Sequence, residues 1–332
     1  KRLSIYGKGN SISSLPFVNG SLLINLKIRN KIKLDKNKKF VEVNGNMEAY
    51  EVHNFLIKKK LFFPSFPSYP SVTIGACIAN CTHGISPKFG IMSDYIEEIK
   101  LFNPNFGTKI LSKKKNKKLF DLTIGGMGLT GIILKAKLKI LKLNSTYVKI
   151  IENRKFSNFL NLYKFLNNNK YIYNQNNLFL KFDRKNFFNS RVSSGSFEKN
   201  KYSIKLVKNN KISWFRFGIL SISIFRKLLD LILLIKEYTF KKKMLHINEV
   251  FYPSNSRLIY FNLMPKKFME HQTIIPHGNV KNFFKDLKKI IIASAPVITL
   301  CHLKIFNGKG KYLQFNGKGL GLTIHFVIDK NF

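Results

Sequence analysis

Apolar and polar residues alternate over many short runs of this chain, and this pattern predicts a fold rich in short β-strands. Strands are expected at residues 22–26, 39–44, 95–102 and 131–143, where apolar positions alternate with polar ones or β-branched side chains gather. Residues 47–60 instead carry apolar side chains three or four positions apart, which predicts a helix. Strands and helices therefore mix in this part of the chain, as they do in an α+β domain.

Prolines and small residues interrupt this pattern before residue 95. Residues 63–70 contain three prolines and cannot form a helix. The run VTIGACIANCTHG at residues 72–84 is rich in β-branched and small side chains, so residues 71–84 are expected to form a strand, a tight turn and a loop. Residues 119–123 are expected to form a short helix or a turn.

A change of pattern near residue 145 divides the chain into two predicted domains, residues 1–145 and residues 146–332. Helices of the second domain are expected at residues 156–166, 280–293 and most of 217–241. Its strands are expected at residues 178–182, 271–275, 299–306 and 322–328, and after a turn within residues 191–197. These elements predict a second sheet with helices on one face.

The composition is strongly basic: the chain has 332 residues, with 58 Lys or Arg, 17 Asp or Glu, and a net charge of +41. One interpretation is a polyanionic partner, such as a nucleic acid, an anionic membrane or a phosphorylated substrate. The other is compositional drift, because Lys, Asn, Ile and Phe are all abundant and the lysines are spread along the chain. No specific nucleic-acid partner is expected, since no helix-turn-helix, zinc-ligand spacing or aromatic RNA-binding signature is recognisable.

The three cysteines, Cys77, Cys81 and Cys301, form neither a CxxC pair nor a disulfide framework. A reducing compartment and no metal site are therefore expected. No secretory signal is recognisable. The apolar stretch at residues 217–238 is interrupted by Arg226, Lys227 and Asp230, which predicts an amphipathic helix facing the core or a membrane surface, and not a transmembrane helix.

Three segments with small residues would let the backbone approach a large, flat ligand. The first, GKGNS at residues 7–11, lacks the third glycine and the helix pattern of a Rossmann fingerprint, so a bare turn and a nest for phosphate oxygens both remain open. The second is the run at residues 72–84. The third, GGMGLTG at residues 125–131, has four glycines in seven positions. One bulky ligand crossing all three segments is predicted, and FAD fits that description.

In this order, the segments resemble the flavoproteins of the vanillyl-alcohol-oxidase type, also called the p-cresol-methylhydroxylase type. Within that superfamily the chain is similar to the decaprenylphosphoryl-β-D-ribose 2′-oxidase family. The similarity includes PSYPSVTIG at residues 67–75, THG at 82–84, FMEHQTIIP at 268–276, HLKIF at 302–306 and GLTIHF at 321–326. The resemblance extends over most of the chain, but residues 145–260 match only loosely.

This resemblance implies a two-domain α+β flavoprotein fold. Residues 1–145 would be an FAD-binding domain of short mixed strands and helices, and residues 146–332 a substrate domain with an antiparallel sheet and flanking helices. The resemblance also implies that an N-terminal part of the FAD domain, and a C-terminal segment that returns to it, are not among these 332 residues.

The resemblance also assigns site residues where this sequence matches the family. For FAD, these are Gly7, Gly9, Asn10 and Ser11 near the pyrophosphate; Thr73, Gly75, Ala79, His83 and Gly84 in the second segment; and Gly125, Gly128, Gly131 and Ile132 along the adenosine half. In the second domain, Gln272 and Lys304 are implied to face the flavin and the sugar from neighbouring strands. His325 would help to deprotonate the substrate hydroxyl, since imidazole titrates near working pH.

Several positions depart from related sequences. Asn10 stands where related lactone and alditol oxidases have a histidine that bonds covalently to the flavin, so non-covalent FAD is expected. Glu270, Thr323 and His325 stand where well-known members of the family have glutamine, asparagine and cysteine. These changes leave dehydrogenation of a sugar as the expected chemistry but leave the sugar and the lipid open.

The reaction implied by the resemblance is oxidation of a secondary alcohol, at C2 of a polyprenyl-phosphoryl pentose, by hydride transfer to flavin N5. A partner reductase would then reduce the keto sugar. A soluble alditol or aldonolactone oxidase of the same fold is one alternative, and a basic nucleic-acid-binding protein is an alternative of another class. A lipid-phosphate substrate predicts a cytoplasmic protein bound peripherally to the inner face of an anionic membrane.

Overall fold

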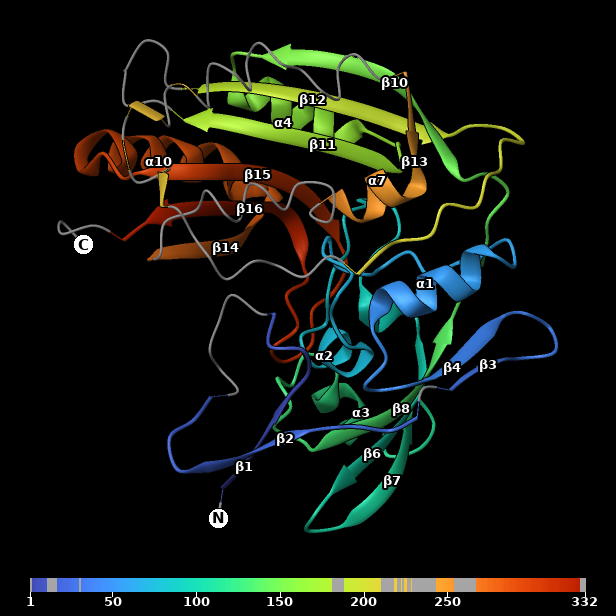
Figure 1. The fold of residues 1–332 in the computed structure, drawn as a ribbon. Helices are drawn as coiled ribbons and strands as arrows, with labels where there is room; N and C mark the ends of the chain where they lie inside the picture. The colour runs from blue at the N-terminus through green and yellow to red at the C-terminus, as the bar shows by residue number, and fades with distance from the viewer. Residues whose placement is uncertain are drawn as a thin grey trace.

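A computed structural model describes most of the chain, in two β-rich halves that contact each other (Figure 1). The described residues are 2–10, 17–29, 31–180, 188–209, 218–219, 222, 224–225, 228, 243–253 and 267–328. Ser11 and most of the helix expected at residues 217–241 lie outside them. Among the described residues, no helix combines the length and apolar character needed to span a bilayer.

The N-terminal half is organised around an antiparallel sheet of five strands in the order β3-β4-β8-β6-β7. These strands are β3 (Ile32–Leu34), β4 (Phe40–Asn44), β6 (Ile96–Asn103), β7 (Gly107–Ser112) and β8 (Ile132–Lys139). The strands predicted at residues 39–44 and 95–102 are confirmed as β4 and β6. The run at 131–143 forms β8 and then β9 (Leu141–Lys142), which pairs with β5 (Leu61–Phe62) in a separate ladder.

Two further strands, three α-helices and a 3₁₀ turn complete the described part of this half. Strand β1 (Arg2–Tyr6) pairs in parallel with β2 (Ser21–Asn25), which confirms the strand expected at residues 22–26. Helix α1 (Ala49–Ile57) confirms the helix expected at residues 47–60, and its start is fixed by the Glu48 N–H, which donates to the Glu51 carboxylate at 2.8 Å. The remaining helices are α2 (Ile74–Ala79), the 3₁₀ turn η1 (Met92–Asp94) and α3 (Lys117–Thr123).

Helix α2 contradicts the strand and tight turn expected within residues 71–84. Its buried residues Ile74, Cys77 and Ile78 are three and four positions apart, which is helical spacing. Thr73 caps the helix by accepting a hydrogen bond from the Ala76 N–H at 3.3 Å. The prediction was wrong because the β-branched side chains suggested a strand, whereas the helical spacing and the capping threonine decide the local structure.

The C-terminal half contains two antiparallel sheets, with strand orders β11-β12-β10-β13 and β14-β16-β15. The strands are β10 (Tyr147–Phe156), β11 (Tyr173–Leu180), β12 (Phe188–Phe197), β13 (Met244–His246), β14 (Phe268–Pro276), β15 (Ile298–Asn307) and β16 (Lys318–Val327). Strand β11 lies beside β15 (Figure 1). The strands expected at residues 271–275, 299–306 and 322–328 are confirmed, whereas residues 191–197 contain no turn and belong to the continuous strand β12.

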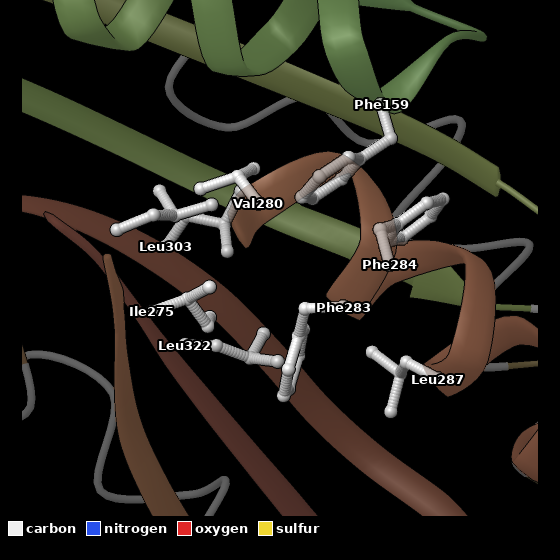
Figure 2. A pocket seen from close by; sticks show the side chains of 9 residues that line it. Phe159, Ile275, Val280, Phe283, Phe284, Leu287, Leu303 and Leu322 are labelled. Carbon is white, nitrogen blue, oxygen red and sulfur yellow. The ribbon is translucent and has the colours of Figure 1, made fainter. Parts of the chain in front are cut away.

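The helices of this half are α4 (Phe159–Asn168), α7 (Ile247–Phe251), the 3₁₀ turn η3 (His277–Asn279) and α10 (Val280–Ser294). Helices α4 and α10 share a core with one face of the β14-β16-β15 sheet, and the rings of Phe159 and Phe284 stack at 3.6 Å between centroids. Figure 2 shows the small apolar cavity that remains in this core, about 10 Å³ in volume. Such a volume is at the lower limit for one water molecule, and the apolar walls offer it no polar partner. The cavity is therefore a packing gap and not a ligand site.

The two faces of the β14-β16-β15 sheet differ in character. Leu303, Leu322 and Ile275 point into the core with α4 and α10. Residues of the opposite parity point toward the N-terminal half, and Phe306 packs into the core of that half together with Val148 and Leu245. The main core therefore includes residues on both sides of position 145, and the domain boundary expected there stays a prediction.

Candidate functional site

The first glycine segment lies directly on the second. A Cβ atom added to Gly7 would come within 2.5 Å of Thr73 Oγ1, so any larger residue would push the two segments apart. The Asn10 side-chain amide donates to the backbone oxygen of Ser71 at 2.6 Å. The backbone N–H groups of Lys8, Gly9 and Asn10 have no acceptor within the described residues, so they are free to bind an anion such as a phosphate.

The third glycine segment is attached to the end of helix α2. The N–H groups of Gly125 and Met127 donate to the backbone oxygens of Ile78 and Ala79, at 3.0 and 2.9 Å. Gly75 packs at the other end of this helix, where an added Cβ would lie 3.1 Å from the Gly45 oxygen. All three segments therefore meet around α2, as expected for a ligand that crosses them.

Glycine is required at the positions of the third segment for different structural reasons. A Cβ on Gly131, next to Ile132 at the start of β8, would lie 2.3 Å from the Phe102 oxygen, and one on Gly125 would lie 3.0 Å from Gln314 Cγ. Packing explains these two glycines. Gly128 has a φ of +82° and Gly9 has a φ of +68°, yet no protein atom lies within 4 Å of an added Cβ at either position. Both therefore face open space, where a ligand could approach the backbone closely.

His83 and Gly84 form a turn at the border between the two halves. His83 Nδ1 lies 2.9 Å from the backbone oxygen of Gly84; because that oxygen can only accept, Nδ1 carries the proton and Nε2 has the lone pair. Burial, and next the charge of Lys304, lower the pKa of His83 to about 3. The imidazole is therefore neutral at physiological pH. Its ring lies 5.3 Å from the ring of Phe306.

A row of polar side chains covers the sheet face that points toward this turn. The strand register places Gln272 opposite Thr323 and Thr323 opposite His302. Two residues further along β15, Lys304 lies opposite Gly321 of β16. Residues two apart share a face of a strand, and residues directly opposite share it across strands. This polar face consists of Glu270, Gln272, His302, Lys304, Thr323 and His325.

Lys304 joins the polar face to the N-terminal half. Its ammonium group donates to the backbone oxygens of His83 and Gly84, at 2.5 and 3.0 Å. Burial lowers the pKa of Lys304 to about 7. Gln272 and Lys304 share a face, as expected, but the expectation that they lie on neighbouring strands was wrong, because β16 lies between β14 and β15. Sequence order does not reveal strand order in an antiparallel sheet.

Glu270 is hydrogen-bonded on both of its carboxylate oxygens. His325 Nε2 lies 2.6 Å from Oε2, and the Gln272 amide donates to Oε1 at 2.7 Å. Burial raises the pKa of Glu270, but the hydrogen bond and charge of His325, with smaller effects of His302 and Gln272, outweigh it and lower the pKa overall. His325 is 5% exposed, and its Nδ1 is buried without a hydrogen-bond partner among the described residues.

His302 is a residue of this face that the sequence did not single out. Burial, and next the charge of His325, lower its pKa to about 4, so its imidazole is neutral at physiological pH. The sequence could have indicated His302, because it lies two positions before Lys304 in a predicted strand and must share its face. Within the described residues, no group of three or more His, Cys, Asp or Glu side chains is arranged to hold a metal ion.

The N-terminal part of the chain is similar to known flavin-binding sequences. Residues 1–108 match the model of a family described as an FAD binding domain. The D-arabinono-1,4-lactone oxidase of Candida glabrata is 28% identical over 146 residues, which cover 42% of this chain and 28% of that protein. The chain is related to FAD-binding oxidoreductases of the p-cresol-methylhydroxylase type.

Other relatives are identical to this chain to a similar extent but carry different names. The L-gulonolactone oxidase of Bos taurus is 27% identical over 139 residues, covering 42% of this chain and 32% of that protein. The decaprenylphosphoryl-beta-D-ribose oxidase of Mycolicibacterium smegmatis is 26% identical over 144 residues, covering 42% of this chain and 31% of that protein. The matched part of the chain thus spans about a third of each relative's length, and these identities do not select one family among them.

The residues of the N-terminal half fit FAD. An FAD-binding domain needs donors for a pyrophosphate and backbone that a ring system can approach, and the free N–H groups at residues 8–10 and the open positions at Gly9 and Gly128 provide both. The α+β fold with several antiparallel sheets is confirmed. The individual flavin contacts and the non-covalent mode of binding stay predictions.

Proposed function

We propose that the protein is an FAD-dependent oxidoreductase that oxidises a secondary alcohol of a sugar. The observation that carries this proposal is the contact of Lys304 with the His83–Gly84 turn, because it holds a face of hydrogen-bonding side chains against the flavin-binding half. When bound, FAD supplies the acceptor for the hydride, at N5. The protein's own residues would bind and orient the sugar, exclude water and take up the hydroxyl proton.

Gln272 and Lys304 are suited to hold the sugar. The Gln272 amide donates to Glu270, which leaves its carbonyl oxygen as an acceptor for a sugar hydroxyl. The Lys304 ammonium would offset negative charge that develops on the substrate oxygen. An imidazole of the polar face would accept the hydroxyl proton, a role for which the sequence suggested His325.

Two classes of substrate fit this site. The first is a polyprenyl-phosphoryl pentose oxidised at C2, with a partner reductase that acts on the product, as the resemblance implies. The second is a free aldonolactone or alditol, favoured by the names of the lactone oxidases among the relatives. Both are sugars with a secondary alcohol.

The test is the absorbance spectrum of the purified protein, followed by anaerobic reduction of its flavin. We expect flavin bands in the near-ultraviolet and blue, and bleaching by one of three probes: D-arabinono-1,4-lactone, L-gulono-1,4-lactone or a polyprenyl-phosphoryl ribose. The probe that bleaches the flavin identifies the substrate class. A protein that contains no flavin and takes up none on incubation with FAD would contradict the proposal.

We also expect the flavin to be bound non-covalently. By the family resemblance, Asn10 would take the position of the histidine to which related lactone and alditol oxidases attach their flavin, and an amide cannot form that bond. Precipitation of the protein with acid should therefore release the yellow colour into the supernatant. Colour retained by the washed pellet would show a covalent bond at some other residue.

A lipid-linked substrate predicts peripheral binding to anionic membranes on the cytoplasmic side. The net charge of +41 would attract acidic headgroups, and salt screens such attraction over about 10 Å at 0.1 M ionic strength. We expect co-sedimentation with phosphatidylglycerol vesicles at low salt and its loss at 0.5 M salt, with phosphatidylcholine vesicles as the uncharged control. No sedimentation at low salt would favour the free-sugar class.

A further inference from the structure

The polar face carries two histidines, and they differ in what their ring nitrogens can do. His325 lies opposite Glu270 on the neighbouring strand, and His302 lies opposite Thr323. Both could serve as the base that an alcohol oxidation needs. Their hydrogen bonds separate the two roles.

His325 has no ring nitrogen available to a ligand. Its Nε2 is engaged by Glu270 at 2.6 Å, and its Nδ1 has essentially no contact with solvent. Glu270 in turn accepts from the Gln272 amide at 2.7 Å. The chain of contacts from His325 through Glu270 to Gln272 therefore fixes which way the Gln272 amide points.

His302 is in the opposite situation. It is only partly buried, and its ring makes no hydrogen bond to any residue that the structure describes. It lies across Thr323 from Gln272 and two positions from Lys304 on the same strand. An available imidazole is thus placed between the amide and the ammonium that would hold the sugar.

We propose that His302 accepts the proton of the substrate hydroxyl, and that Glu270 and His325 are positioning residues that orient Gln272. This inference rests on the proposed function. In the step, the O–H bond breaks and its proton goes to an imidazole nitrogen of His302, while the C–H bond breaks and its electron pair leaves as hydride. The alcohol is oxidised to a ketone, bound FAD would take up the hydride's two electrons, and His302 would later release the proton to solvent.

The groups around His302 support this assignment. Glu270 raises the pKa of His302, whereas burial, His325 and Lys304 lower it, and the balance places it at about 4. The neutral His83 also interacts electrostatically with His302. His302 is therefore in its proton-accepting form above about pH 4, and protonation below that value should stop it from acting as a base.

The activity test compares three variants for the rate of flavin reduction by whichever of the three sugar probes reduces the wild type. We expect His302→Gln and His302→Ala to slow reduction by about 10²–10⁴, the usual contribution of a general base, with unchanged flavin content. Added imidazole should restore part of the rate of His302→Ala. The matched control is His271→Gln, an exposed histidine of β14 that lies on the opposite face of the sheet, and it should keep the wild-type rate.

The positioning pair should behave differently. His325→Ala should raise KM and lower kcat through the loss of a fixed Gln272, and imidazole should not rescue it. Rescue of His325→Ala but not of His302→Ala would overturn the assignment, as would a wild-type rate in His302→Gln. If no probe reduces the wild-type flavin, the proposed function fails on its own.

A second readout does not depend on turnover. The seven histidines can be labelled with ¹⁵N, and the His302 signals identified by their absence in His302→Gln. We expect those signals to show a neutral imidazole from pH 8 to pH 5 and to shift when D-arabinono-1,4-lactone or polyprenyl-phosphoryl ribose is added. A protonated His302 at pH 7, or a sugar-induced shift of His325 alone, would refute the proposal even in an inactive protein.

Discussion

Replacing Gly128 by valine is expected to abolish or strongly weaken FAD binding while leaving the protein folded. Gly128 has a φ of +82°, a conformation that β-branched residues avoid at a cost of about 1–3 kcal/mol. A valine would relax the loop to another conformation, and FAD would have to restore the original one. That cost alone corresponds to an increase in Kd of about 5- to 150-fold, and the new side chain would also fill the open space that we assign to the ligand.

The control for this prediction is Gly107→Val. Gly107 lies at the start of β7 with a φ of +71°, and it too has no protein atom within 4 Å of an added Cβ. The two substitutions therefore impose the same kind of backbone strain, but only one of them lies in a proposed flavin segment. Flavin content after purification and Kd by fluorescence titration are the measurements. Equal loss of FAD in both variants would mean that strain, and not ligand contact, explains the effect.

The sequence predicted three strands of the five-stranded sheet, β4, β6 and β8, and helix α1, because these elements depend on local periodicity. Helix α2 was missed because its β-branched residues favoured a strand over the short helical spacing of Ile74, Cys77 and Ile78. The glycines of the third segment were noticed for their number. Only the structure distinguishes Gly131, which avoids a clash with β6, from Gly128, which faces open space.

For the polar face, the resemblance supplied Gln272, Lys304 and His325, and the structure brings all three to one side of one sheet. Their environment could not be predicted from sequence, because it depends on strand order and register. Placing β16 between β14 and β15 puts His325 against Glu270 and leaves His302 available. The same register sets Lys304 against the turn at His83, a contact between residues more than 200 positions apart.

Replacing Lys304 by alanine is expected to slow flavin reduction by about 10²–10³, the usual effect of removing one preorganised donor. FAD binding should change much less, since Lys304 contacts only two backbone oxygens at the end of the second segment, those of His83 and Gly84, and neither of the other two glycine segments. Anaerobic stopped-flow reduction by the sugar probe gives the rate, and the flavin absorbance gives the cofactor content. A rate equal to that of the wild type would remove Lys304 from the active face.

The loss of a tether between the two halves could produce the same slowing, and Lys311→Ala tests this. Lys311 also joins the halves, through an ion pair of 2.9 Å with Asp121 of α3, but it lies in the loop between β15 and β16 and is not a residue of the polar face. The variant Lys311→Ala should therefore keep the wild-type rate.

The pH profile gives a second test, because a pKa of about 7 for Lys304 means that its charge is present below that pH and lost above it. Wild-type reduction should slow as the pH rises through about 7, and Lys304→Arg should remove this decline, since a guanidinium stays protonated. An identical decline in Lys304→Arg would assign the titration to another group and would leave the charge of Lys304 without a part in the reaction.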